Sequence, residues 1–235
     1  MIENKLLYTG KAKNVYQAEN NDEVLIVYKD QATALNGKKK EILPGKGTLD
    51  CQISQLVFNY LIKNGIKTHL VKNLSDHEQL VKKTQVFPLE VVLRNITSGS
   101  LVKKFQVEAG QRLVEPIIEF YYKSDALDDP FINESQIQAL KIANEKELAY
   151  IKKMTLEVNE LLKPFFDQAG FDLVDFKLEY GRFNDEIILV DEFSPDNCRL
   201  WDKKDHHSMD KDVFRKHEGD LVKTYQAVLK RLQDK

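Results

Sequence analysis

The most informative segment of the chain is LVDFKLEYG, residues 173–181. Apolar and charged side chains alternate along it, which predicts an extended strand with one face against a core. The face toward the core is formed by Val174, Phe176 and Leu178. The opposite face carries the charged side chains Asp175, Lys177 and Glu179. A sheet built on this strand therefore has a charged surface on which a functional site could lie.

The segment that follows predicts a hairpin that brings carboxylates together. The turn GRFND leads into the apolar run EIILV, which ends just before Asp191. A hairpin centred on Phe183 would place Asp175 opposite Asp191, with Glu179 on the same side. Converging carboxylates repel one another unless a cation neutralises them, and Mg²⁺ prefers a few carboxylates together with phosphate oxygens. The hairpin therefore predicts either a Mg-ATP site that uses Glu179 and Asp191 or a solvated sheet face with a salt bridge through Lys177.

The remaining segments predict an α+β fold. Apolar runs bounded by turn residues predict strands at 5–8, 14–18, 24–28, 67–71, 81–84, 89–94, 171–180 and 186–192. Helical spacing of apolar residues predicts helices at 48–64, 100–107, 144–168 and 210–233. Polar loops are expected at 30–47 and 120–135. A break near Pro88 predicts an N-terminal antiparallel lobe, residues 1–86, and a larger mixed lobe, residues 87–235.

Composition excludes several classes of protein. With 35 Lys+Arg against 37 Asp+Glu, the chain lacks the overall basic charge of a nucleic-acid binder. The opening MIENKLLYTG does not resemble a secretory signal, and no segment has the apolar length of a membrane span. Cys51 and Cys198 are too few for a disulfide framework and fit a reducing compartment. We therefore expect a cytoplasmic protein without nucleic-acid or membrane partners.

Two further segments could bind anions. The apolar run before Arg94 leads to a turn of small residues at Ser100, which could bind a sugar phosphate or simply cap a helix. The loop FSPDNCRLWD places Asp196 and Arg199 just beyond the candidate metal ligands. An arginine there could bind a phosphate or carboxylate through two parallel hydrogen bonds. The alternative for this loop is a surface segment anchored by Trp201.

Lysines supply a third candidate anion site. In GKAK, residues 10–13, alternation sends Lys11 and Lys13 to the same side, where they could cover ATP phosphates or remain solvated. The chain contains no Walker motif, so this is not a P-loop. The GKG at 45–47 predicts a turn, and the lysines at 38–40 predict a solvated loop.

Taken together, these motifs resemble those of the SAICAR synthetase family. GKAKNVY, FPLEVVLRN with SGSLVKKF, LVDFKLEYG, and VDEFSPD with CRLWDKK occur in the family's order and spacing over nearly the whole chain. The resemblance implies that carboxyaminoimidazole ribonucleotide (CAIR), L-aspartate and ATP give the succinocarboxamide ribonucleotide SAICAR, ADP and phosphate. It implies ATP and Mg²⁺ as cofactors, a kinase-like N-terminal lobe, and an ATP-grasp-like larger lobe with ATP in the cleft between them. A homodimer is a further expectation from the resemblance.

The resemblance also assigns roles to residues. ATP would contact Lys11, Ala12, Lys13, Lys123, Glu179 and the backbone at Val86. Mg²⁺ would be held by Glu179 and Asp191. The nucleotide substrate would be bound by Arg94, Ser100, Asp196 and Arg199. Catalytic roles are expected for Lys177, near the transferred phosphoryl group, and for Asp175, which could orient the substrate or accept a proton. The alternatives are a small-molecule kinase with a similar Mg-ATP site, although neither HRD nor DFG occurs, and a nucleotide-sensing regulator.

Overall fold

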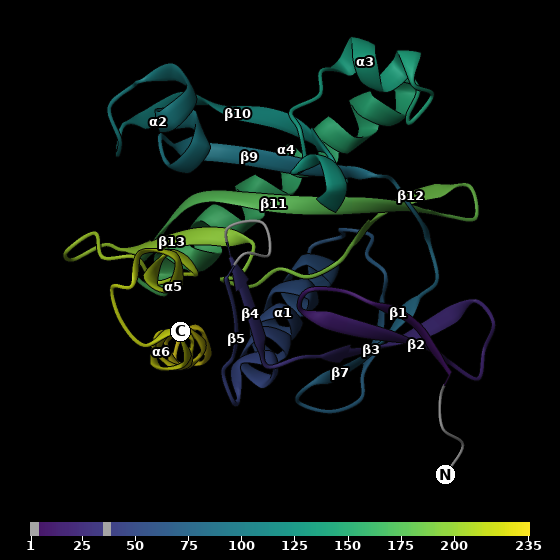
Figure 1. Ribbon diagram of the computed structural model, residues 1–235, viewed down its shortest axis with the longest axis horizontal. Helices are drawn as coiled ribbons and strands as arrows, with labels where there is room; N and C mark the ends of the chain where they lie inside the picture. Colours follow the sequence, from purple (N-terminus) through teal and green to yellow (C-terminus); the bar gives the residue numbers. More distant parts are fainter. Residues whose placement is uncertain (1–4, 35–38) are drawn as a thin grey trace.

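The computed structural model describes residues 5–34 and 39–235 and contains two larger antiparallel sheets (Figure 1). The first sheet has five strands in the order β1-β2-β3-β7-β6. Its strands are β1 (Leu6–Thr9), β2 (Lys13–Gln17), β3 (Glu23–Tyr28), β6 (Leu70–Asn73) and β7 (Glu78–Lys82). Burial alternates along β3, so that Val24, Ile26 and Tyr28 pack inward. The three predicted N-terminal strands are confirmed.

The second sheet has six strands and is organised around β11 (Phe171–Phe183). Its other strands are β8 (Gln85–Val86), β9 (Leu89–Ile96), β10 (Arg112–Tyr122), β12 (Glu186–Val190) and β13 (Cys198–Asp202). All pairings of β11, with β8, β9, β12 and β13, are antiparallel. The strand first identified in the sequence is therefore central, and side chains that lie far apart in the sequence meet on its surface.

Helices cover the sheets and share one apolar core with the six-stranded sheet. The longer ones are α1 (Lys46–Lys63), α4 (Glu145–Gln168) and α6 (Leu221–Gln233). The shorter ones are α2 (Gly99–Phe105), the 3₁₀ helix Asp125–Leu127, α3 (Glu134–Ala139) and α5 (Asp212–Lys216). Helix α4 packs against β11 and begins with a capping box, in which Asn144 and Glu147 each accept a hydrogen bond from the other's backbone N–H.

Several predicted boundaries are wrong. The expected loop 30–47 contains a hairpin of β4 (Gln31–Ala34) and β5 (Lys39–Ile42), whose short polar strands give no apolar pattern. Of the lysines expected in a solvated loop, Lys40 is exposed, whereas Lys39 is half-buried and its ammonium donates to the carbonyl of Phe214; Lys38 lies outside the described residues. Strand β10 extends into the expected loop 120–135, and the predicted C-terminal helix is divided into α5 and α6.

The predicted register of the β11–β12 hairpin is also wrong. Phe183 pairs with Glu186, so the turn is centred between Asn184 and Asp185 rather than on Phe183. Asn184 has a φ of 53°, a left-handed conformation that asparagine adopts readily in tight hairpin turns. Asp175 therefore does not lie opposite Asp191; it pairs instead with residues of β9 and β13.

The proposed boundary between residues 86 and 87 falls between β8 and β9, and β8 itself pairs with β11. The division into residues 1–86 and 87–235 stays a prediction. Among the described helices, none combines the length and the apolar character that crossing a bilayer would require.

Candidate active site

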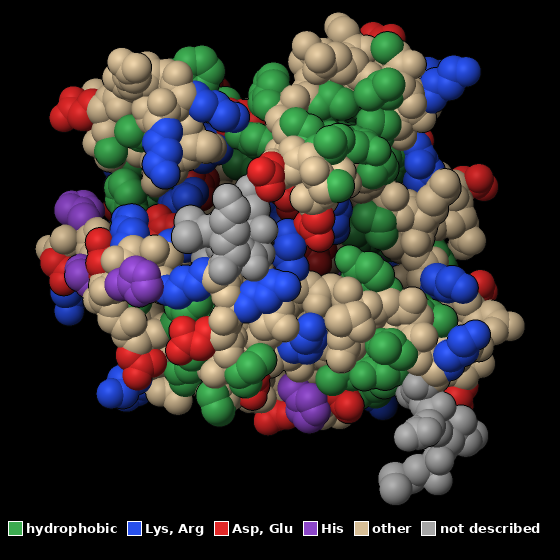
Figure 2. Space-filling view, in the orientation of Figure 1, with side chains coloured by type: hydrophobic (Ala, Val, Ile, Leu, Met, Phe, Trp, Pro, Cys, Tyr) green, Lys and Arg blue, Asp and Glu red, His purple; other side chains and the backbone are tan. Residues whose placement is uncertain are grey.

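Two adjoining cavities lie where the sheets face each other. The first has a volume of about 870 Å³ and is lined by Lys11 and Lys13 from one sheet and by Val86 and Glu179 from the other. The second, of about 280 Å³, lies over β9, β11 and β13. Both cavities share the lining residues Glu90, Lys177, Asp196, Asn197 and Arg215. Figure 2 shows the hollow between the two halves of the molecule, with acidic side chains at its base.

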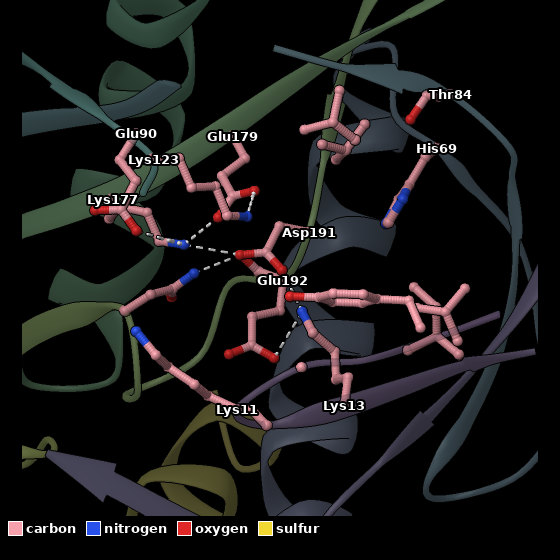
Figure 3. Close-up of a pocket in the computed structure, with 18 of the residues that line it drawn as sticks. Lys11, Lys13, His69, Thr84, Glu90, Lys123, Lys177, Glu179, Asp191 and Glu192 are labelled. Atoms are coloured by element: carbon pink, nitrogen blue, oxygen red, sulfur yellow. Dashed lines mark hydrogen bonds and ion pairs between the residues drawn. The ribbon is translucent and has the colours of Figure 1, made fainter. Parts of the chain in front are cut away.

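The floor of the first cavity is a group of alternating ammonium and carboxylate groups, which we call the lysine cluster (Figure 3). Its members are Lys13, Lys123, Lys177, Glu179, Asp191 and Glu192. The Lys177 ammonium lies 2.6 Å from Glu179 and 2.9 Å from Asp191. Lys13 bridges Asp191 and Glu192, and Lys123 binds Glu179. Since Lys177 contacts both carboxylates, Glu179 and Asp191 converge on one point.

Charge in the lysine cluster is fixed by mutual attraction. Burial alone would raise the pKa of Asp191, but Lys13 and Lys177 lower it well below its usual value. Burial would lower the pKa of Lys177, yet Asp191 and Glu179 raise it well above the ordinary range. Lys13, Lys177 and Asp191 are therefore ionised near neutral pH. Asp191 also has a φ of 68°, an uncommon conformation that turns the chain at the end of β12.

The donor chemistry of Glu179 and Asp191 fits Mg²⁺. Each of their four carboxylate oxygens accepts a hydrogen bond from a lysine, so each can face a cation. No group of three or more His, Cys, Asp or Glu residues within 5–34 and 39–235 is arranged to hold a metal. Two carboxylates are enough for Mg²⁺, which keeps several waters and takes its other ligands from phosphate oxygens.

The second cavity is backed by a row of alternating acidic and basic side chains, which we call the arginine ladder. Its members, from β10 to α5, are Glu119, Arg94, Asp175, Arg199, Asp212 and Arg215. Successive members are joined by hydrogen bonds of 2.7, 3.1, 2.9, 3.1 and 2.6 Å. Burial would raise the pKa of Asp212, but Arg199 and Arg215 lower it to about 2. Asp212 is thus ionised at neutral pH.

The predicted site residues divide between these two groups and the cavity walls. Lys11 lies at the mouth of the first cavity, where it forms an exposed ion pair of 2.6 Å with Asp125. Ala12 and Val86 line the same cavity. Ser100 does not cap α2; the N-cap is Ser98, and the Ser100 hydroxyl accepts a hydrogen bond from Arg94 instead.

Asp196 lines both cavities, but its carboxylate is already bound within the protein. It accepts hydrogen bonds from Lys46 at 2.6 Å, Lys211 at 2.9 Å and Tyr225 at 2.7 Å. Lys46 is fully buried and also binds Asp50 at 2.5 Å. The GKG segment is therefore not a simple turn, because its lysine starts α1 and anchors the loop between β12 and β13.

Sequence reasoning missed several lining residues. They are Glu90, Glu192, Lys211 and Arg215. Glu192 follows Asp191 directly, which could have marked it as a second acid at the strand end. The other three are brought to the cavities by strand pairing and by α5, and no local spacing marks them.

Comparisons with known proteins agree with this geometry. The family model described as SAICAR synthetase matches residues 6–232. A phosphoribosylaminoimidazole-succinocarboxamide synthase of Latilactobacillus sakei is 57% identical over 227 residues, covering 97% of this chain and 94% of that protein. The structure of such a synthase from Ehrlichia chaffeensis superposes with a TM-score of 0.95 at 41% identity, covering 97% and 98% of the two chains.

A second solved structure carries a ligand. It is a SAICAR synthetase in complex with ADP, with a TM-score of 0.94, 43% identity and 97% coverage of both chains. The mixed α/β architecture with antiparallel sheets is therefore common to these proteins and to this chain. Matches this extensive, in a chain whose recognised motifs line the same two cavities, place it in the SAICAR synthetase family.

Proposed function

We propose that the chain is an ATP-dependent ligase that joins CAIR and L-aspartate to give SAICAR, ADP and phosphate. The observation that carries the proposal is the adjoining of the two cavities, which share Glu90 and Lys177. A phosphoryl group bound over the lysine cluster can thereby meet the carboxylate of a nucleotide bound against the arginine ladder. The ADP complex of a relative with 43% identity supports nucleotide binding in this fold.

The reaction requires activation because a carboxylate is a poor electrophile. A CAIR carboxylate oxygen attacks the γ-phosphorus of ATP, ADP leaves, and an acyl phosphate forms. The neutral amine of aspartate then attacks the acyl carbon, phosphate leaves, and the nitrogen loses a proton. The lysines of the cluster can exchange their carboxylate partners for phosphate oxygens, which neutralises charge on the moving group. Water must be kept from the acyl phosphate during the reaction, because it would hydrolyse this intermediate.

Residue roles follow from the contacts. Glu179 and Asp191 would hold Mg²⁺, which when bound supplies positive charge to the phosphates. Lys11, Ala12, Lys13, Lys123 and the Val86 backbone would contact ATP, and Arg94, Ser100 and Arg199 would bind the CAIR phosphate.

Asp175 and Asp196 receive narrower roles. Both oxygens of Asp175 already accept hydrogen bonds from arginines, so we assign it an orienting role rather than that of proton acceptor. Asp196 faces the substrate but is held by Lys46, Lys211 and Tyr225, which suits it to present Lys211 to the cavity.

The proposal also covers the two lobes, the cellular location and the oligomeric state. The two sheets would belong to a kinase-like lobe, residues 1–86, and an ATP-grasp-like lobe, residues 87–235, with ATP between them. Both cysteines are free and buried. A cytoplasmic location remains a proposal from the sequence, in which two cysteines are too few for a disulfide framework. A homodimer remains an expectation of the family resemblance.

The test is ADP release from Mg-ATP and CAIR with and without L-aspartate. The ligase predicts ADP formation that requires both substrates and yields a new amide. Sustained ADP formation with a stable phosphorylated product in the absence of aspartate would identify a small-molecule kinase instead. ATP binding without any turnover would contradict an enzymatic role.

A further inference from the structure

Two acidic residues of the arginine ladder lie behind the arginines rather than in a cavity. Neither Glu119 nor Asp212 is among the described residues that line either cavity, whereas Arg94, Asp175 and Arg199 line the second one. We propose that Glu119 and Asp212 are positioning residues that fix the guanidinium groups of Arg94 and Arg199 for binding the phosphate of the nucleotide substrate. This inference rests on the proposed function of the second cavity.

The Arg94 side chain is held on three sides. Its Nε donates to Glu119 at 2.7 Å, its Nη1 to Asp175 at 3.1 Å and its Nη2 to Ser100 at 2.8 Å. The side chain is only 3% exposed. A guanidinium has five N–H donors in a rigid fork, so these bonds leave one N–H on each terminal nitrogen for a ligand. Glu119 is itself held by the Tyr121 hydroxyl at 3.1 Å, which limits its movement.

The Arg199 side chain is held by acids at two of its nitrogens. Its Nε donates to Asp212 at 3.1 Å, and its Nη1 donates to Asp175 at 2.9 Å. Its Nη2 donates to no acceptor in the described part of the chain and belongs to a side chain that lines the second cavity. Both N–H groups of this nitrogen are thus available to an oxyanion.

The two acids act at equivalent points of the two arginines. Each binds Nε, the nitrogen nearest the aliphatic stem, while Asp175 binds Nη1 of both. A guanidinium fixed at Nε and Nη1 cannot rotate about its stem, so its remaining N–H groups keep one direction. Because each arginine side chain is already fixed before the ligand binds, it loses less conformational entropy on binding.

If only their charge mattered, Glu119 and Asp212 would weaken phosphate binding rather than strengthen it. Glu119 and Asp212 carry negative charge close to the proposed phosphate site, which by itself repels an anion. Removing their charge would therefore strengthen phosphate binding if they had no positioning role. The two effects differ in sign, and the KM of the nucleotide substrate separates them.

The experiment compares Glu119→Ala and Asp212→Ala with Glu119→Gln and Asp212→Asn. Positioning predicts that the alanine variants raise the KM for CAIR about tenfold, with the KM for ATP unchanged and kcat within about twofold. The amide variants lose the charge but keep an acceptor oxygen, so their KM should rise less, by about threefold. A KM for CAIR that falls or stays unchanged in all four would overturn the inference.

Asp202→Ala is the matched control. Asp202 lies on β13, the strand that carries Arg199, and binds another arginine, Arg231, at 2.5 Å. It lines neither cavity in the described chain. It should lower thermal stability without changing the KM for CAIR. If an alanine variant of the ladder does not fold, the sign of the KM change in the amide variants decides the question.

Arg199→Lys distinguishes failure of the inference from failure of the proposed function. Lysine cannot form the fork, so the KM for CAIR should rise. An unchanged KM in Arg199→Lys would refute the assignment of the second cavity to the nucleotide phosphate. A raised KM there, together with an unchanged KM in Asp212→Ala, would refute only the positioning role.

Discussion

The lysine cluster and the arginine ladder neutralise buried carboxylates in different ways. In the lysine cluster, three ammonium groups on flexible stems cover the carboxylates of Glu179 and Asp191. In the arginine ladder, planar guanidiniums are fixed by acids on both sides, as Arg199 is between Asp175 and Asp212. An ammonium is a point charge that can change partner, whereas a guanidinium fork fits one geometry. The cluster thus suits a phosphoryl group that moves during the reaction, and the ladder suits a phosphate that stays in place.

The largest effect is expected from Asp191→Asn in the lysine cluster. The substitution removes one of two carboxylates that fit Mg²⁺ and takes one anionic partner from each of Lys13 and Lys177. We expect kcat to fall by at least ~10²-fold, the scale of losing one preorganised electrostatic group. Asp185→Asn, in the exposed hairpin turn, should keep normal turnover. Near-normal turnover of Asp191→Asn at saturating Mg²⁺ would refute the metal assignment.

The fixed geometry of the ladder can be disturbed at Arg199 with Gly99→Ala. Gly99 has a φ of +56°, and a Cβ there would lie 2.7 Å from Nη2 of Arg199. The guanidinium must then move, so the KM for CAIR should rise about tenfold. Gly65→Ala is the control, because Gly65 has a φ of +88° and a Cβ there would meet nothing within 4 Å. Equal KM values for CAIR in the two variants would mean that Arg199 can shift without loss of binding, which would contradict the fixed geometry of the ladder.

The proposal that lysines of the cluster can give up their carboxylate partners can be tested with Lys177→Met. Without nucleotide, the Lys177 ammonium competes with a metal for Glu179 and Asp191. Removing a competitor worth about 1 kcal/mol should tighten Mn²⁺ binding to the nucleotide-free protein about fivefold, measured by electron paramagnetic resonance. Lys67→Met, which removes an exposed ion pair with Glu186, is the control. Unchanged Mn²⁺ affinity in Lys177→Met would show that the lysine does not occupy the metal position.

The sequence predicted the elements whose pattern is local. The alternation in β11 and the apolar stripe of α4 identified both elements, because the apolar side chains of each lie on one face. The loop 30–47 was misassigned because β4 and β5 are short and polar, which gives them no apolar face to recognise. Helix α1 begins at Lys46, a lysine that no apolar pattern would place in a core.

The sequence predicted which residues form the candidate site better than it predicted the contacts between them. The sequence predicted that Asp175, Lys177 and Glu179 lie on one face of β11. Lys177 and Glu179 line the first cavity, and Asp175 lines the second. The partners of Asp175 are set by register across β9 and β13, which the hairpin turn does not determine. Glu119 and Asp212 stayed unnoticed because each meets its arginine only through tertiary packing.

The smallest expected effect concerns pH and separates the two regions once more. His69 lines the first cavity; burial, assisted by Lys13, lowers its pKa to about 3. Since this histidine in the unfolded chain binds a proton near its ordinary pKa of 6.5, stability present above that pH is lost as the pH falls toward 3. From about pH 7 to about pH 6, this histidine should cost the folded state about 0.7 kcal/mol.

Urea unfolding of the wild type and of His69→Gln at these two pH values measures this contribution. The variant should lose less stability on acidification than the wild type does. In the ladder, the pKa of Asp212 is lowered to about 2 from 3.8, so its contribution is lost only in stronger acid. Equal slopes for the wild type and His69→Gln would mean that the cluster side of the molecule does not set the response to weak acid.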